Sequence, residues 1–337
     1  MGKTQEEVRR ERLDRGIKVR SDSVYAIASL RDMAYLLSPR IIPVVAVFVL
    51  PLVLGGYWTK VMVYAAVYGL LALSWDFLAS CGLFSLGQAL FFGMGAYLVG
   101  IMNHYFGWPV VVTLPAATLC GGALCTLLLA PVIRLRGVYF AMVTLVIPML
   151  FSRLIVATKL FGGSHGLTNL TPFGGEWFST YFILISLFVC LFALRRIIGE
   201  DYGLVLRAIR DDDRAVMSAA INIFWRKIQA LFLSASIGCF AGAFMCHHYQ
   251  FTGPSAFALD YSLMPLAATA LGGPGTFVGA VIGSAILVPL SEALRAFGGL
   301  RIAFYCVILI GSIIVLPEGV FHFIARKYHQ FERDVEV

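Results

Sequence analysis

Residues 61–80 read VMVYAAVYGLLALSWDFLAS, an almost unbroken apolar run. The run contains one acidic side chain, Asp76, and neither lysine nor arginine. A helix rises about 1.5 Å per residue, so about 20 such residues cross the hydrocarbon core of a bilayer. The stretch therefore predicts a transmembrane helix. Asp76 lies near one end of it, where we expect its side chain to reach the interface with water.

The rest of the chain repeats this pattern. Its 337 residues are 59% hydrophobic and 13% charged, against about 25% charged residues in ordinary soluble domains. That composition excludes a soluble fold and predicts an all-α, polytopic transmembrane helical bundle of about ten segments. The run at 262–273 is too short to cross and ends at the sequence GGPG, so we expect one short or broken segment. The expected segments are 41–57, 61–80, 84–106, 109–133, 137–158, 179–197, 228–248, 262–273, 276–293 and 302–317.

The distribution of basic residues predicts the topology. Lysine and arginine collect in cytoplasmic loops, and here they concentrate in 1–40, 198–227 and the last residues of the chain. We expect a charged cytoplasmic arm at 1–40, a transmembrane domain at 41–320 and a cytoplasmic tail at 321–337, with both termini cytoplasmic. The net charge of +7 is thus a topology signal. Nucleic acid is not expected as a partner, because the basic residues are separated by apolar spans.

Two glycine-rich stretches interrupt the apolar spans, GLFSLGQALFFGMGAYL at 82–98 and LGGPGTFVGAVIGS at 271–284. Glycine in a membrane helix allows either a close approach between helices or a break in one. Interrupted segments in both halves of a transporter are typical of its translocation pathway. The alternative is close packing through small residues, with no contact to solute. The candidate pathway residues are Ser85, Gly87, Gln88, Gly93, Gly95, Gly272, Gly273 and Gly275.

A cluster of charged residues occupies the long loop at 198–227. Acidic residues favour a helix N-terminus, so we expect a short helix that starts near Asp212. A long, helical, charged loop without a soluble domain of its own is typical of a docking surface, although an ordinary solvated loop is the alternative. The candidate coupling residues are Arg207, Arg210, Asp211, Asp212, Asp213, Arg214, Ala220 and Asn222.

Six motifs in order resemble the LivM-type membrane permeases of bacterial ABC importers for branched-chain amino acids, and the related urea-import permeases look similar. These motifs are the two glycine stretches, RLRGVYFAMVTL at 134–145, GGSHGLTNL at 162–170, the charged loop with the span that follows it at 208–244, and LPEGV at 316–320. Met149, Ala220 and Ala280 depart from the family pattern, which often has glutamate, glycine and proline at these positions.

The resemblance implies a multi-pass protein of the bacterial inner membrane. It also implies a second permease, which is usually a different chain, two ATPase subunits that bind the cytoplasmic loops of the two permeases (198–227 in this chain), and an external solute-binding protein. ATP and Mg²⁺ would bind the ATPases, since this chain has no Gly-x-x-x-x-Gly-Lys-Ser/Thr loop. The expected solutes are branched-chain or other amino acids, urea, amides or small carboxylates.

Two other classes of protein compete with a transport subunit of this kind. An ion-coupled secondary transporter would usually keep carboxylates near the membrane midplane, and none is evident in the sequence. An intramembrane enzyme could hold Mg²⁺ on Asp211–Asp213, but a second acidic motif facing the same cavity is lacking. We therefore expect no catalytic residues and no metal site, and the cysteines are expected to be packing residues.

Overall fold

The computed structural model describes residues 30–135, 137–295, 307, 310–311, 314 and 319–333. The chain divides into two compact units, Met1–Val53 and Leu54–Val337. The described part of the first unit is helix α2 (Leu30–Val53), whose apolar stretch, Ile42–Val53, is shorter than a membrane span. The expected span at 41–57 therefore ends early, because the chain leaves the helix at Leu54–Gly55 before α3 begins at Gly56.

The second unit is helical. Within the described residues its β structure is limited to an isolated bridge between Leu167 and Thr252. Six of its helices are long and apolar enough to cross a membrane. These are α3 (Gly56–Ala79), α4 (Gln88–Phe106), α5 (Val110–Leu129), α6 (Val138–Thr158), α7 (Glu176–Gly199) and α10 (Ile223–Tyr249).

Shorter helices connect or flank these spans. The α-helices are α8 (Asp201–Asp211), α9 (Asp213–Ser218), α11 (Asp260–Gly272), α12 (Val278–Ala293) and α14 (Val320–Arg333). The 3-10 turns are η1 (Val132–Arg134), η2 (Leu160–Gly162) and η3 (Pro254–Phe257).

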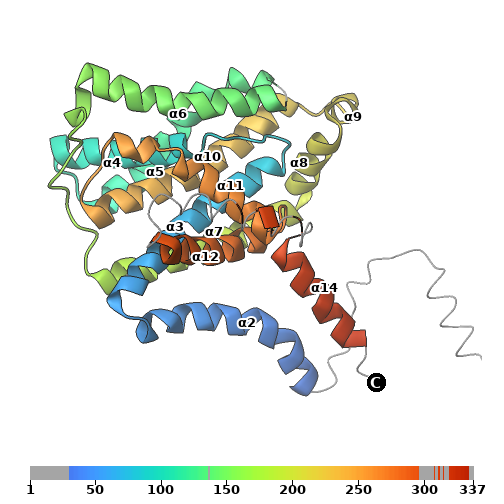
Figure 1. Cartoon of the computed structure of the whole chain (residues 1–337). Helices are drawn as coiled ribbons and strands as arrows, with labels where there is room; N and C mark the ends of the chain where they lie inside the picture. The colour runs from blue at the N-terminus through green and yellow to red at the C-terminus, as the bar shows by residue number, and fades with distance from the viewer. Residues whose placement is uncertain are drawn as a thin grey trace, which may run out of the picture. The chain divides into compact units, whose positions relative to one another are not determined.

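Helices α3 and α10 form the centre of this unit. In their most apolar stretches 78% and 72% of residues are buried, against 22% in α6. In Figure 1, α3 and α10 cross the middle of the unit and α6 runs along its edge. The exposed side chains of α6 include Met142, Val146 and Leu150, which recur on one helical face. That face is therefore available to lipid or to another membrane protein.

Six of the expected segments correspond to helices that can span a membrane, which confirms the all-helical membrane fold. Helix α4 begins at Gln88 instead of residue 84, because 83–87 are not helical. Helices α11 and α12 have 13 and 16 residues, so each is shorter than the roughly 20 residues of a crossing. Most of the segment expected at 302–317 lies outside the described residues, as do 1–29 of the charged arm and 334–337 of the tail.

Two ends of the bundle can be defined from these helices. The end with α8 and α9, here called the loop end, also holds the last turn of α3 and the start of α4. The other end, here called the far end, holds the start of α3 and the last turn of α10.

Candidate functional site

The loop at 198–227 contains two helices, α8 and α9. Helix α9 begins at Asp213, and the Asp212 carboxylate caps it by accepting a hydrogen bond of 2.8 Å from the Arg214 backbone N–H. This confirms the helix expected near Asp212. Helix α8 was not expected from the sequence, although its Gly203, Leu206 and Ile209 face inward at the period of an amphipathic helix.

The candidate coupling residues do not all lie on the surface. Asp213 is half-buried and forms an ion pair of 3.0 Å with Lys227 at the start of α10. Their side chains are 21% and 12% exposed, so water screens this pair less than a surface pair. Asp211 instead pairs with its neighbour Arg210 at 3.6 Å. The exposed members are Arg207, Arg210, Asp211, Asp212, Arg214, Ala220 and Asn222.

Large apolar side chains stand among these exposed charges. Leu204 on α8 and Met217 on α9 are 60% and 52% exposed, and Trp225 at the start of α10 is 60% exposed. Exposed apolar side chains bordered by charge mark an interaction surface. The surface formed by Leu204, Arg207, Arg214 and Met217 is called the coupling surface below.

The coupling surface connects directly to the first glycine stretch. A Cβ on Gly82, which has φ of +75°, would lie 3.2 Å from the Cα of Arg210, so the end of α8 rests on the turn after α3. A cleft of about 280 Å³ lies at this contact and is lined by Gly82, Leu83 and residues 209–214. A displacement of α8 would therefore be transmitted first to residues 80–87.

Residues 83–87 are non-helical although they lie between two spans, and side chains from other helices satisfy their backbone. The indole Nε1 of Trp75 donates to the Ser85 carbonyl at 2.7 Å, and the Leu86 N–H donates to Thr144 Oγ1 at 3.0 Å. Ser85 Oγ accepts from the Gly87 N–H at 3.0 Å. Buried backbone groups outside a helix require such partners, so side chains of other helices hold this connection between α3 and α4 in place.

Gln88 lies at the start of α4 in a buried polar cluster. Ser74 Oγ lies 3.0 Å from Gln88 Oε1 and 2.9 Å from the Ser234 carbonyl, either of which can accept its single proton, and Ser234 Oγ donates to the Ser74 carbonyl at 2.9 Å. The Ala89 N–H donates to Ser262 Oγ at 3.0 Å, which brings α11 to the same place. Gln88 Nε2 is buried and has no hydrogen-bond partner among the described residues. One amide atom of Gln88 is therefore left for a further hydrogen bond inside the bundle.

Asp76 does not reach the interface with water, contrary to expectation. Its side chain is fully buried, and its two carboxyl oxygens accept hydrogen bonds from the backbone N–H groups of Gly275 at 2.7 Å and Phe277 at 2.9 Å. Gly273 and Gly275 have φ of +110° and +82°, so this turn follows a path that favours glycine. Asp76 thus ties the second glycine stretch to α3, a role that sequence reasoning missed.

The glycines inside α4 permit close approach to neighbouring segments. A Cβ on Gly93 would collide with the ring of Phe257, and one on Gly95 would collide with the backbone of Cys239 on α10. Cβ atoms on Gly272 and Gly283 would collide with the backbones of Gly279 and Ala268, so α11 and α12 are equally close. These positions have a packing role, and their place in a translocation pathway stays a prediction.

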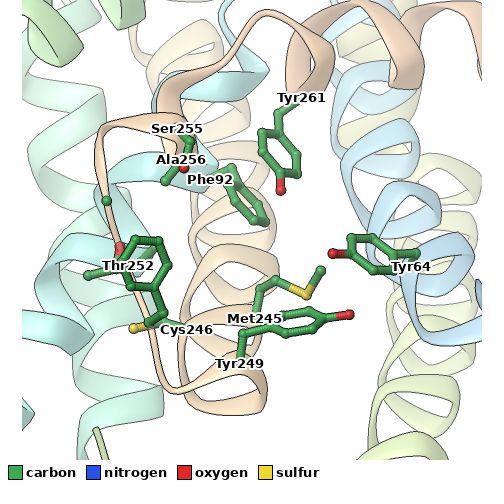
Figure 2. Close-up of a pocket in the computed structure, with 12 residues that line it drawn as sticks. Tyr64, Phe92, Met245, Cys246, Tyr249, Thr252, Ser255, Ala256 and Tyr261 are labelled. Carbon is green, nitrogen blue, oxygen red and sulfur yellow. The ribbon is translucent and has the colours of Figure 1, made fainter. Parts of the chain in front are cut away.

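A pocket of about 160 Å³ lies between α3, α4, α10 and α11 toward the far end, and a single water needs only ~10–15 Å³. Figure 2 shows Tyr64, Tyr249 and Tyr261 around it, each from a different helix. Tyr261 stacks on Phe92 with ring centroids 3.9 Å apart, and the rings of Tyr64 and Tyr249 are 5.6 Å apart. None of the twelve described lining residues is charged.

None of the candidate pathway residues lines this aromatic pocket. Tyr64 lies far in the sequence from Tyr249 and Tyr261, so no local motif predicts the meeting of the three tyrosines. The available signal is the presence of tyrosines, with polar hydroxyls, inside apolar spans. The Thr252 hydroxyl at the pocket wall is buried and has no partner among the described residues.

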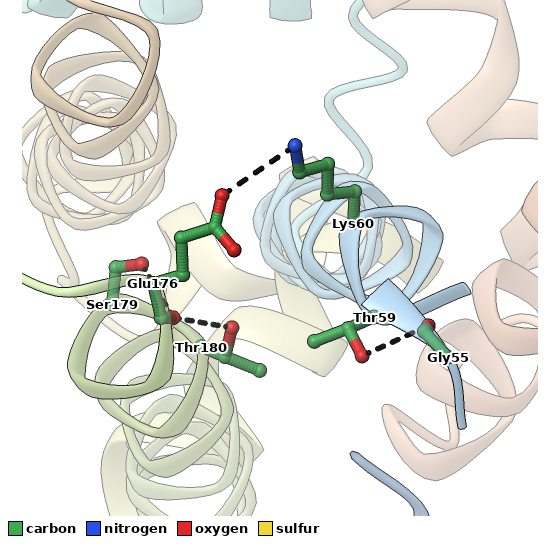
Figure 3. Close-up of polar contacts among 6 residues, drawn as sticks. All are labelled: Gly55, Thr59, Lys60, Glu176, Ser179 and Thr180. Atoms are coloured by element: carbon green, nitrogen blue, oxygen red, sulfur yellow. Dashed lines mark hydrogen bonds and ion pairs between the residues drawn. The ribbon is translucent and has the colours of Figure 1, made fainter. Parts of the chain in front are cut away.

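The far end carries an exposed ion pair that joins α3 to α7. Lys60 Nζ lies 3.5 Å from Glu176 Oε1, and Figure 3 shows the two side chains reaching toward each other. Thr180 Oγ1 donates to the Glu176 carbonyl at 2.8 Å within the first turn of α7. Both charged side chains are more than half exposed, so the pair adds little stability. It supplies surface charge beside the aromatic pocket's Tyr249.

Within the described ranges, His, Cys, Asp and Glu side chains do not gather in groups of three or more that could hold a metal ion. The described cysteines are free thiols. Tyr202 on α8 lies beside Arg226, 5.6 Å from the ring centroid to the guanidinium carbon. Burial raises the pKa of Tyr202 to about 12, so this contact is made by a neutral phenol.

Comparison with known proteins identifies a family. The family of the branched-chain amino acid transport system permease component matches residues 57–316. The high-affinity branched-chain amino acid transport system permease proteins LivM of Salmonella typhimurium and Escherichia coli are each 30% identical to this chain. Each match covers 71% of this chain and 63% of the relative's length. A probable LivM permease of Methanocaldococcus jannaschii is 23% identical over 52% of this chain and 53% of its own length. No solved structure matches the chain.

The helical bundle, with six helices long and apolar enough to cross a membrane and buried polar contacts between them, defines a polytopic membrane protein. The chain belongs to the branched-chain amino acid transport system permease component family. It is a multi-pass inner-membrane protein, and its family is not known to be enzymatic.

Proposed function

We propose that this chain is the permease subunit of an ABC importer, in which α8 and α9 dock partner ATPase subunits. The observation that carries the proposal is the coupling surface. Leu204 and Met217 are exposed beside Arg207 and Arg214, and the end of α8 rests on Gly82 at the first glycine stretch. A docked ATPase subunit would thus act directly on the non-helical stretch between α3 and α4.

The proposed assembly contains a second, different permease, two ATPase subunits and an external solute-binding protein. ATP and Mg²⁺ bind the ATPases and not this chain, whose sequence has no phosphate-binding loop. The exposed apolar face of α6 offers a surface for the second permease or for lipid.

The proposed topology follows the positive-inside rule. The loop end is cytoplasmic, because α8, α9 and the start of α10 carry Arg207, Arg210, Arg214 and Lys227. The far end then faces outward, and about ten membrane segments with both termini inside satisfy the same rule.

The proposed solute is small and polar, and a branched-chain amino acid is the first candidate because the relatives' printed names specify that transport system. The aromatic pocket is lined by Tyr64 and Tyr249, which lie near the far end, where a binding protein would deliver solute. Its uncharged lining favours a solute without net charge, because an unpaired charge is costly to desolvate. From there the buried break at Ser85–Gln88 leads toward the loop end.

Asp76 is the feature most relevant to an ion-coupled secondary transporter, the alternative class. A buried carboxyl group inside a span is typical of ion-coupled carriers. Here both oxygens already accept backbone N–H groups of the turn at 275–277, which favours a structural role. The importer remains the better interpretation.

The test is purification of the tagged chain from native membranes in mild detergent, with ATPase assays and mass spectrometry. Two ATPase subunits and a second permease are expected, and Leu204→Glu with Met217→Glu should remove the ATPases. Leu160→Glu is the matched control, since Leu160 is 56% exposed on η2, away from the coupling surface. Recovery of the chain alone after crosslinking, with transport abolished by an ionophore, would overturn the proposal.

A further inference from the structure

Helix α14 follows the last apolar segment and has two chemically different sides. Its sequence is VFHFIARKYHQFER. Basic or imidazole residues occur at 322, 326, 329 and 333, and apolar residues at 320, 324 and 331. In a helix of 3.6 residues per turn these two sets fall on opposite faces, and position 327, a lysine, falls on the apolar side.

The described side chains of α14 agree with this division. His322 and Arg326 are exposed, whereas Val320 is half-buried. Ile324, one turn beyond Val320 on the apolar side, is nevertheless 54% exposed. Apolar surface therefore continues along α14 past the point where the bundle covers it. A helix of 14 residues is marginal in water without a surface to pack against.

The start of α14 is attached to the bundle at the level of the second glycine turn. Gly319, with φ of +85°, passes so close to Gly273 that a Cβ on Gly319 would collide with it. Gly273 begins the turn whose N–H groups at 275 and 277 are held by Asp76, near the last turn of α3. Helix α14 also contacts α11 and α12. It therefore leaves the bundle where α3 reaches the end of its span.

We propose that α14 lies flat on the cytoplasmic membrane surface, with the Ile324 side toward the acyl chains and the Arg326 side toward anionic phospholipid headgroups. Charge complementarity selects this occupant. The helix carries Arg326, Lys327 and Arg333 against a single acidic residue, Glu332, and basic side chains at this surface attract anionic lipid. The lipid surface is also continuous with the bilayer around the spans. This inference goes beyond the proposed transport function and does not depend on it.

The experiment places a spin label at one position at a time in the full-length chain, in nanodiscs of phosphatidylcholine with or without phosphatidylglycerol. The test positions are Ile324→Cys and His322→Cys in a cysteine-free background. Accessibility to oxygen and to a water-soluble nickel complex is measured. A variant that keeps only the native Cys120, which is exposed on the span α5, supplies the lipid reference. Met217→Cys on α9, in the cysteine-free background, supplies the water reference.

With phosphatidylglycerol present, the label at 324 should resemble the lipid reference and the label at 322 should face the nickel complex. Arg326→Glu, which reverses a charge on the headgroup side only, should weaken the lipid-like signal at 324. A further variant, Ile324→Ser, keeps every charge of α14 and removes apolar surface. With the spin label at position 320, this variant separates the effect of losing apolar contact from the effect of losing charge.

Three results would overturn the proposal. Water-like signals at both positions in either lipid would show a helix in solution. Equal signals with and without phosphatidylglycerol would show that anionic headgroups do not bind α14. Shielding at 324 that appears only after ATPase subunits are added would make the face a protein docking surface.

Discussion

Ala220 occupies a backbone conformation that favours glycine. Its φ is +57°, one residue after Ala219, which caps the end of α9. This is the position at which helices commonly end in a left-handed glycine. A non-glycine residue is strained there by roughly 1–2 kcal/mol, partly offset because glycine loses roughly 0.5–1 kcal/mol more chain entropy on folding. The structure thus gives a physical reason for the glycine that the resemblance led us to expect at this position.

Ala220→Gly should therefore stabilise the turn between α9 and α10 by up to about 1 kcal/mol. Slower hydrogen exchange of the α9 amides would report the gain. Ala219→Gly is the matched control, because Ala219 has an ordinary φ of −82° and should only lose stability. Faster exchange in Ala220→Gly than in the native chain would contradict this account.

Asp76→Asn keeps one acceptor oxygen and replaces the other with an NH₂ group. One of the N–H groups at Gly275 and Phe277 then loses its partner, and a buried unsatisfied group costs about 1–3 kcal/mol. The expected result is a lower thermal midpoint of the purified chain. Asp260→Asn, at an exposed residue in the first turn of α11, should change the midpoint much less. Equal shifts in the two variants would show that the Asp76 hydrogen bonds contribute no more to stability than an exposed carboxyl group does.

At the scale of elements, the ion pair between Asp213 and Lys227 holds α9 against α10. We expect Asp213→Asn to lower solute transport while partner ATPase activity continues, because α9 would move without carrying α10. The ratio of solute moved to ATP hydrolysed, measured in proteoliposomes of the whole assembly, reports this loss. The exchanged pair Asp213→Lys with Lys227→Asp should recover part of the coupling.

The control for this pair is another ion pair in the same region. Arg196 and Glu200 lie 2.7 Å apart, but their side chains are 82% and 55% exposed, so Glu200→Gln should leave the ratio unchanged. A fall in the ratio with Glu200→Gln as large as with Asp213→Asn would indicate a general effect of charge at the loop end.

For the whole molecule, the topology makes a prediction about access. In a cysteine-free background, Met217→Cys on α9 should react with a membrane-impermeant maleimide only after cells are permeabilised. Leu160→Cys on η2 should react in intact cells, because η2 lies between α6 and α7 at the far end. The reverse pattern would invert the proposed orientation and with it the docking of ATPases on α8 and α9.

The sequence predicted the spans well because each is encoded locally. An apolar run of about 20 residues needs no partner to be recognised, and six expected runs correspond to α3, α4, α5, α6, α7 and α10. The exact start of α4 was wrong, since the break at 83–87 depends on Trp75 and Thr144 from other helices. The number of segments and the side on which the termini lie stay predictions.

The candidate site was less predictable because its contacts join distant parts of the chain. The helix at Asp212 was evident from a local cap, whereas the inward turn of Asp213 depends on Lys227 fourteen residues later. The burial of Asp76 depends on a turn almost two hundred residues away. The aromatic pocket likewise takes one tyrosine from each of α3, α10 and α11. Spacing along the sequence carries little information about such meetings.

The tie between Asp76 and Gly275 also sets an order of events during biosynthesis. The two residues are separated by 199 positions, and a ribosome adds about 5–20 residues per second, so about 10–40 s pass before the partner of Asp76 exists. During that interval α3 is a newly made segment with an unsatisfied carboxyl group, which must wait in the translocon, in water or beside a chaperone. A nascent chain arrested at residue 270 should therefore crosslink through position 76 to the insertion machinery, and the completed, released chain should not. The packing of α3 can thus be completed only after residues 275–277 have been synthesised.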